Sequence, residues 1–152
     1  MNKKIRYASM AMMLVMALMG TTSQMWAQQQ VRLRARQNKV INGIEAQLRG
    51  DFREAASPIR LNSELENINM RAGTPVAFCL LKGGVRTLLG VGRVAVVGGV
   101  PVASVELSAN DGDFVPSVDA GDVLQARQRA TAPFNPSPTC NSVLLISAAF
   151  QK

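Results

Sequence analysis

The clearest structural signal in this chain lies in residues 85–107, which read VRTLLGVGRVAVVGGVPVASVEL. Two runs rich in β-branched residues flank Gly98-Gly99, a pair typical of a tight hairpin turn. Gly90 and Gly92 interrupt the first run, as expected at a bulge or a sharp bend where a strand crosses between sheet faces. The stretch therefore predicts a long β-hairpin.

The sequence on both sides of this hairpin has the same character. Apolar runs are separated by short turns that contain Gly, Asp or Pro, which is the pattern of short antiparallel strands. Five or six such strands predict a mainly β fold, a small antiparallel barrel or sandwich, over residues 73–152. The runs beyond the hairpin are residues 75–81, 123–127 and 142–150.

Residues 39–72 have a different pattern, which favours a short helical preface to the β domain. Val40, Ile44, Leu48 and Phe52 recur every four residues, which would place them along one side of a helix. Residues 63–66, Ser-Glu-Leu-Glu, have the spacing of a helix capping box. Short strands are the alternative for this segment.

The N-terminal 27 residues have the layout of a secretory signal peptide. Lys3, Lys4 and Arg6 precede an uncharged run from Ala8 to Gly20, and the small residue Ala27 offers a cleavage site. The apolar run is too short to form a stable membrane-spanning helix, and we find no other candidate span in the mature chain. We therefore expect an exported protein, periplasmic or extracellular.

Positive charge is concentrated just after this leader. The net charge of +7 falls by three, to +4, when the leader is removed, and Arg32, Arg34, Arg36 and Lys39 all precede the first acid, Glu45. We interpret residues 28–38 as a basic flexible arm that contacts an anionic envelope surface. A solvated segment without a binding role is the alternative.

The two cysteines, Cys79 and Cys140, predict one intramolecular disulfide in an oxidising compartment. Two free thiols or an intermolecular bond are the alternatives. Closing a loop of this length would stabilise the fold by roughly 4 kcal/mol in the chain-entropy model.

Several chemistries are disfavoured by composition. The chain has no histidine, so it lacks the commonest general base and metal ligand, and a Ser-His-Asp site cannot form. Residues 90–95 match the form G-x-G-x-x-A, but a strand and a turn follow where a dinucleotide site needs a helix. We therefore expect no cofactor and no catalytic residues.

Binding of metals and nucleic acids also has little support in the sequence. Four aspartates in turns, Asp111, Asp113, Asp119 and Asp122, leave calcium binding open, although aspartate is an ordinary turn residue. Tyr7 and Trp26 both lie in the leader, so the mature domain lacks Tyr and Trp for base stacking, and we do not expect nucleic-acid binding.

These observations together favour a non-catalytic structural or binding subunit of a bacterial envelope assembly. In this hypothesis, strand edges contact a protein partner or a second copy, and the basic arm contacts the anionic surface. The alternative is a monomeric secreted inhibitor or ligand-binding β module. The mass of the folded protein in solution separates the two.

Overall fold

The computed structural model describes residues 31–54, 58–129 and 137–152. The predicted signal peptide and residues 28–30 of the predicted arm lie outside these ranges. The described residues form nine strands and one short 3-10 helix: β1 (Val31–Ile41), β2 (Ile44–Glu54), β3 (Arg60–Glu66), β4 (Pro75–Lys82), β5 (Val85–Arg93), β6 (Ala95–Val97), β7 (Val100–Ser108), η1 (Ala109–Asp111), β8 (Val123–Gln128) and β9 (Val143–Gln151).

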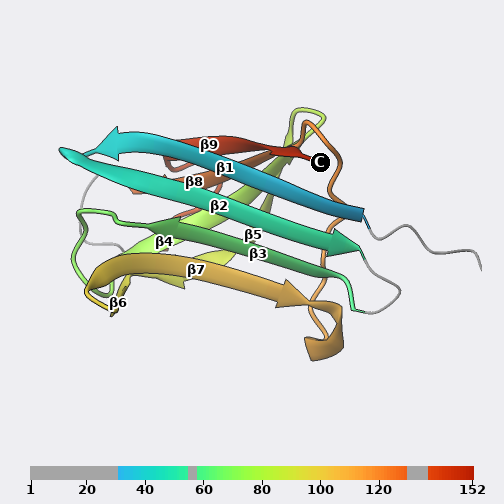
Figure 1. The fold of residues 1–152 in the computed structure, drawn as a ribbon, viewed down its shortest axis with the longest axis horizontal. Helices are drawn as coiled ribbons and strands as arrows, with labels where there is room; N and C mark the ends of the chain where they lie inside the picture. The colour runs from blue at the N-terminus through green and yellow to red at the C-terminus, as the bar shows by residue number, and fades with distance from the viewer. Residues whose placement is uncertain (1–30, 55–57, 130–136) are drawn as a thin grey trace, which may run out of the picture.

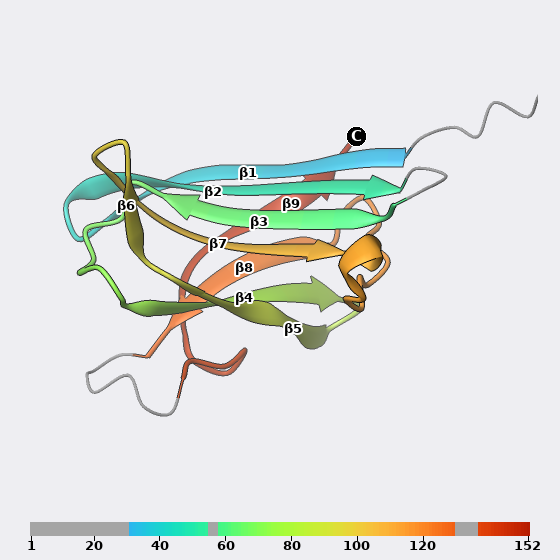
Figure 2. The same cartoon turned by 90° about the horizontal axis from the view of Figure 1, so that it is seen from below.

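All nine strands belong to one antiparallel sheet that curls into a half-barrel, which confirms the predicted mainly β class (Figure 1). The strand order is β5-β4-β8-β9-β1-β2-β3-β7-β6. Seen from below, β1, β2, β3 and β7 form one layer, and β4, β5 and β8 lie across from it (Figure 2). β9 joins the layers, because it pairs with β8 along its length and with β1 at only two positions.

The predicted helical preface over residues 39–72 is wrong, because this segment contributes to three strands. Asn42 and Gly43 have positive φ angles of 52° and 80° and reverse the chain between β1 and β2. Asn-Gly is a strong hairpin signal that outweighs the four-residue spacing of the apolar side chains. The spacing also fits a strand, since Leu48 and Phe52 lie on one face of β2 with a period of two.

The capping-box interpretation of residues 63–66 fails for the same reason. These residues lie in β3, which pairs with both β2 and β7. Ser63 and Leu65 point into the core, whereas Glu64 and Glu66 are only partly buried. The alternation of small or apolar with acidic residues is the pattern of a half-buried strand.

The prediction of a flexible arm is wrong for residues 31–38, which belong to β1. This strand pairs with β2 at every position from Val31 to Ile41. Leu33 and Ala35 are each only 2% exposed, so β1 is anchored in the core. The strands before residue 73 are therefore part of the same sheet as those after it.

The predicted long hairpin at residues 85–107 is short in the structure, because only β6 pairs with β7, at three positions, but the predicted bend is present. β5 pairs with β4, whereas β6 pairs with β7, so the chain passes from one layer to the other at the single residue Val94. The pairing of β4 with β5 shifts register between Phe78 and Cys79, where β5 carries one extra residue, Leu89. Such a bulge increases the local twist and turns the strand.

The predicted Cys79–Cys140 disulfide is present. Cys79 is fully buried in β4, and Cys140 lies in the segment 137–142 that precedes β9. Arg127 of β8 reinforces this attachment, because its Nη1 donates to the Ser142 carbonyl at 2.7 Å. A buried disulfide is compatible with an oxidising, exported location.

Candidate functional site

The outward-facing side chains of β1, β2 and β3 form a surface that we call the charged face. Side chains alternate along a strand, so the core positions Leu33 and Ala35 place Arg32, Arg34 and Arg36 together on the outside of β1. The next two strands contribute further polar side chains to the same face: Gln47, Arg49, Asp51 and Arg53 from β2, and Arg60, Asn62, Glu64 and Glu66 from β3.

Strand register places both like and unlike charges opposite one another on the charged face: Arg32 lies opposite Arg53, which itself lies opposite Arg60. Arg34 lies opposite Asp51, and Arg36 lies opposite Arg49, which itself lies opposite Glu64. Cross-strand pairs of opposite charge stabilise a sheet, whereas like charges destabilise it. The positive charge is greatest on β1, where all three outward arginines are exposed.

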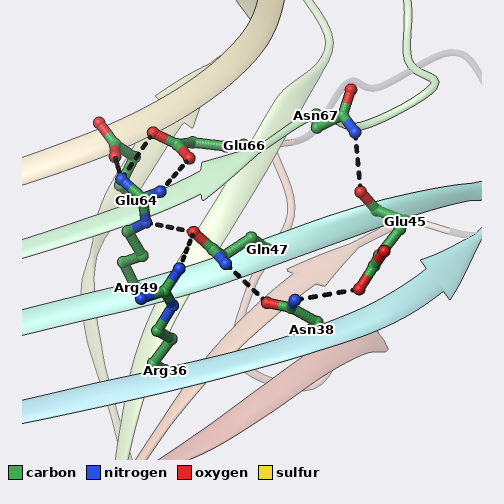
Figure 3. Close-up of polar contacts among 8 residues, drawn as sticks. All are labelled: Arg36, Asn38, Glu45, Gln47, Arg49, Glu64, Glu66 and Asn67. Carbon is green, nitrogen blue, oxygen red and sulfur yellow. Dashed lines mark hydrogen bonds and ion pairs between the residues drawn. The ribbon is translucent and has the colours of Figure 1, made fainter.

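Arg49 is the centre of one polar network (Figure 3). Its Nη2 lies 2.9 Å from Glu66 Oε2, and its Nη1 lies 3.9 Å from Glu64 Oε1. Its Nε donates to Gln47 Oε1, which also accepts from Arg36 Nη2 at 3.4 Å. Partial burial and the neighbouring Glu66 carboxylate raise the pKa of Glu64.

A second cluster forms around Asp51. Arg32 binds this carboxylate through two nitrogens, at 2.9 and 2.8 Å, and Arg53 Nη2 lies 2.7 Å from Asp51 Oδ2. Partial burial acts to raise the pKa of Asp51, but the hydrogen bonds from the two arginines outweigh it and lower the pKa. The charge of Arg32 is therefore largely neutralised within the fold.

Arg34 and Arg36 are placed differently from Arg32. Within the described part of the chain, no side chain forms a hydrogen bond or ion pair with Arg34, and Arg36 contacts only the neutral Gln47 amide. Both arginines line a groove of about 310 Å³ between β1 and β9, together with Gln37, Ala149, Gln151 and Lys152. The lining described for this groove has three cationic side chains and no carboxylate side chain.

Lys39, the fourth predicted binding residue, is separated from the three arginines. It has the strand parity of the core-facing positions, and its Nζ donates to the Leu145 carbonyl of β9 at 2.8 Å. Lys152 was missed by the sequence reasoning. It reaches the groove because Gln151 pairs with Arg34 across β1 and β9. This contact joins the first and the last strand of the described chain, so no local sequence pattern predicts it.

The aspartate-containing turns bind groups of the protein itself. Asp119 Oδ2 lies 2.6 Å from Lys82 Nζ, and Asp122 Oδ2 lies 3.6 Å from it. The hydrogen bond to Asp119 raises the pKa of Lys82. Asp113 instead accepts from the backbone N–H of Ser108. No cluster of three or more metal-ligating side chains occurs among the described residues.

Comparison with known proteins gives no match to a family model, to a curated protein or to a solved structure. Within residues 31–54, 58–129 and 137–152, no helix is long and apolar enough to cross a membrane.

Proposed function

We propose that this protein is a non-catalytic, exported binding subunit of the bacterial envelope, which binds an anionic partner through Arg34 and Arg36. The observation that carries the proposal is the groove between β1 and β9, whose lining combines these two arginines with Lys152 and includes no carboxylate side chain. Asp51 and Glu64 border the same two arginines on the side that faces β2 and β3. The ligand chemistry is that of phosphate, sulfate or carboxylate groups, which guanidinium groups bind in a bidentate manner.

The spacing of the two arginines favours a ligand with repeated negative charges. Residues two apart in a strand are separated by about 6.6 Å, so Arg34 and Arg36 can contact successive anionic groups of one polymer. Each exposed contact contributes little by itself, on the order of 0.2–1 kcal/mol. A polymer that occupies both arginines and Lys152 gains the sum of these contributions.

The proposed envelope location rests on two features of the chain. The leader has the composition of a secretory signal, and the disulfide between Cys79 and Cys140 persists in oxidising compartments. A protein partner or self-association at strand edges belongs to the same proposal, with β5, which pairs only with β4, at one edge of the sheet.

Binding measurements with three probes test the proposal: inorganic polyphosphate, a sulfated polysaccharide and poly-glutamate. We expect at least one to bind the protein, with an affinity that falls as salt rises. The double variant Arg34→Gln/Arg36→Gln should weaken binding by about tenfold, as expected for two exposed ionic contacts. The probe with the highest affinity identifies the anionic group that is preferred.

The matched control is Arg60→Gln/Arg86→Gln, which removes the same charge at exposed positions away from the groove. It should retain most of the binding, because only the net charge changes. Equal losses in the two double variants, or no binding of any probe, would contradict a site at Arg34 and Arg36.

A further inference from the structure

Two hairpin turns and one connection meet at a single end of the half-barrel, which we call the rim. The backbone N–H of Asn67 donates to the Pro101 carbonyl of β7 at 2.9 Å, and its side-chain amide donates to the Glu45 carbonyl of β2 at 2.8 Å. Asn69 adds a bond to the Asn42 carbonyl in the β1–β2 turn. These contacts hold the β1–β2 turn, residues 67–74 and the β6–β7 hairpin together (Figure 1).

The rim exposes several aliphatic side chains. Val96 and Val97 are 62% and 64% exposed, and Val40 is 66% exposed. Ile44 and Val100 add smaller exposed areas. The turns that join these strands, Asn42-Gly43 and Gly98-Gly99, carry no charge.

Cationic side chains accompany this aliphatic surface. Lys39, Arg71 and Arg93 are all exposed, and they lie in the β1 strand, the β3–β4 connection and the end of β5 respectively. Arg93 is oriented by a hydrogen bond from its Nη1 to the Gly73 carbonyl at 3.1 Å. One exposed acid, Glu45, also lies at the rim beside Ile44, and its carboxylate accepts a hydrogen bond from the Asn38 side-chain amide.

We propose that the rim docks on a lipid bilayer with anionic headgroups. The exposed valines and Ile44 would enter the interface, while Lys39, Arg71 and Arg93 contact the headgroups, a combination typical of peripheral membrane attachment. This inference goes beyond the groove at Arg34 and Arg36, because the two surfaces share no residue.

A bilayer fits the rim better than an added protein strand. β6 has only three residues, and one of its flanks is paired with β7. The next residue towards β5, Val94, already has its N–H bound to the Thr74 carbonyl and its carbonyl bound to the Gly73 N–H. The free backbone edge is therefore too short for extended strand pairing, whereas the exposed side chains remain available to lipid.

The test is binding to phosphatidylcholine vesicles with and without phosphatidylglycerol, using the form of the protein that accumulates in cells expressing the full chain. We expect binding that increases with phosphatidylglycerol content. Val96→Ser/Val97→Ser should weaken it roughly tenfold or more, since two aliphatic side chains lose their burial. Lys39→Gln and Arg93→Gln should each weaken it roughly fivefold on anionic vesicles.

Control substitutions at the opposite end of the molecule distinguish docking through the rim from nonspecific adsorption to vesicles. Val85 and Phe114 are 67% and 81% exposed there, so Val85→Ser/Phe114→Ser removes comparable apolar surface. This variant should bind vesicles like the wild type. Arg34→Gln/Arg36→Gln should retain the dependence on Val96 and Val97, so that failure of the groove and failure of the rim give different results.

Amide hydrogen exchange provides a local measurement that does not depend on how the rest of the chain behaves. Vesicles should slow exchange in residues 42–44 and 96–100 and leave residues 83–86 unchanged. The proposal is overturned if the protein does not bind, if it binds with unchanged exchange at the rim, or if the rim is protected equally without lipid by self-association at the same concentration.

Discussion

Two glycines of β5 stand where this strand passes close to β7. A Cβ atom added at Gly92 would lie 2.5 Å from the Ser104 carbonyl oxygen, a backbone atom that cannot move by itself. At Gly90 the nearest atom would be Val105 Cγ1, at 2.9 Å, which belongs to a side chain that can rotate. The absence of a side chain at these positions is what allows the two layers to approach.

We predict that Gly92→Ala lowers the free energy of unfolding by about 2–3 kcal/mol, because backbone must shift to admit the methyl group. Gly90→Ala should cost about 1 kcal/mol or less, since Val105 can adjust. Urea unfolding of the two variants measures the difference. Equal stability of the Gly92→Ala variant and the wild type would contradict the close approach of β5 to β7.

The ion pairs around Asp51 make the stability of the fold depend on pH. Because Arg32 and Arg53 lower the pKa of Asp51 in the folded state, the ionised carboxylate stabilises the fold. This contribution is complete above the ordinary aspartate pKa of about 4 and is lost as the pH falls through the folded-state value. Asp51→Asn should be less stable than the wild type by about 1 kcal/mol at pH 7, and the difference should shrink in acid.

Glu64 should affect the pH dependence of stability in the opposite direction to Asp51, so it serves as a control. Its pKa is raised in the fold, so ionisation of Glu64 reduces stability as the pH rises from the ordinary glutamate value through the folded-state value. Thermal unfolding of Asp51→Asn, Glu64→Gln and the wild type across the acid range distinguishes the two effects. A stability difference for Asp51→Asn that does not vary with pH would rule out the proposed ionic contribution.

At the scale of elements, the segment 137–142 is not a strand of the sheet but is attached to two of its strands, β4 and β8. The disulfide anchors it to β4, and Arg127 of β8 donates to both the Ser142 carbonyl and Gln125 Oε1. Burial and the nearby Arg86 lower the pKa of Arg127. This cationic side chain is 8% exposed, so the covering segment shields it from solvent.

Replacing both cysteines, Cys79→Ser/Cys140→Ser, should lower the free energy of unfolding by about 4 kcal/mol in the chain-entropy model. Urea unfolding with and without a reductant measures this change. Reduction should bring the wild type close to the double variant and leave the variant unchanged. An unchanged wild-type midpoint after verified reduction would contradict a stabilising role for the disulfide.

The elements differ in how well local sequence predicts them. Gly98-Gly99 marks its hairpin because two β-rich runs flank it. Asn42-Gly43 is an equally strong turn signal, but the spacing of Val40, Ile44 and Leu48 also fits a helix. Pairing of β1 with both β2 and β9 resolves this ambiguity in favour of strands, and such long-range pairing is not encoded in any short window.

At the scale of the whole molecule, the candidate site depends on how distant segments meet. The cluster of arginines was visible in the sequence, but their separation from Lys39 follows from strand alternation once β1 is a strand. Asp51 lies directly opposite Arg34 in the pairing of β1 with β2, but its carboxylate binds Arg32 in a diagonal contact. The presence of Lys152 beside Arg34 follows from the register with β9. The sequence therefore indicated that arginines of residues 32–36 would form the candidate site. The strand topology determines that Arg34 and Arg36, and not Arg32, line the groove.

The most direct test of this account is an NMR titration of the folded protein with the polyanion that binds best. We predict that backbone amide shifts change first around residues 34–37 and 149–152, on the two strands that border the groove. Shift changes concentrated elsewhere, with these two segments unaffected at saturation, would contradict the assignment of the binding site to β1 and β9.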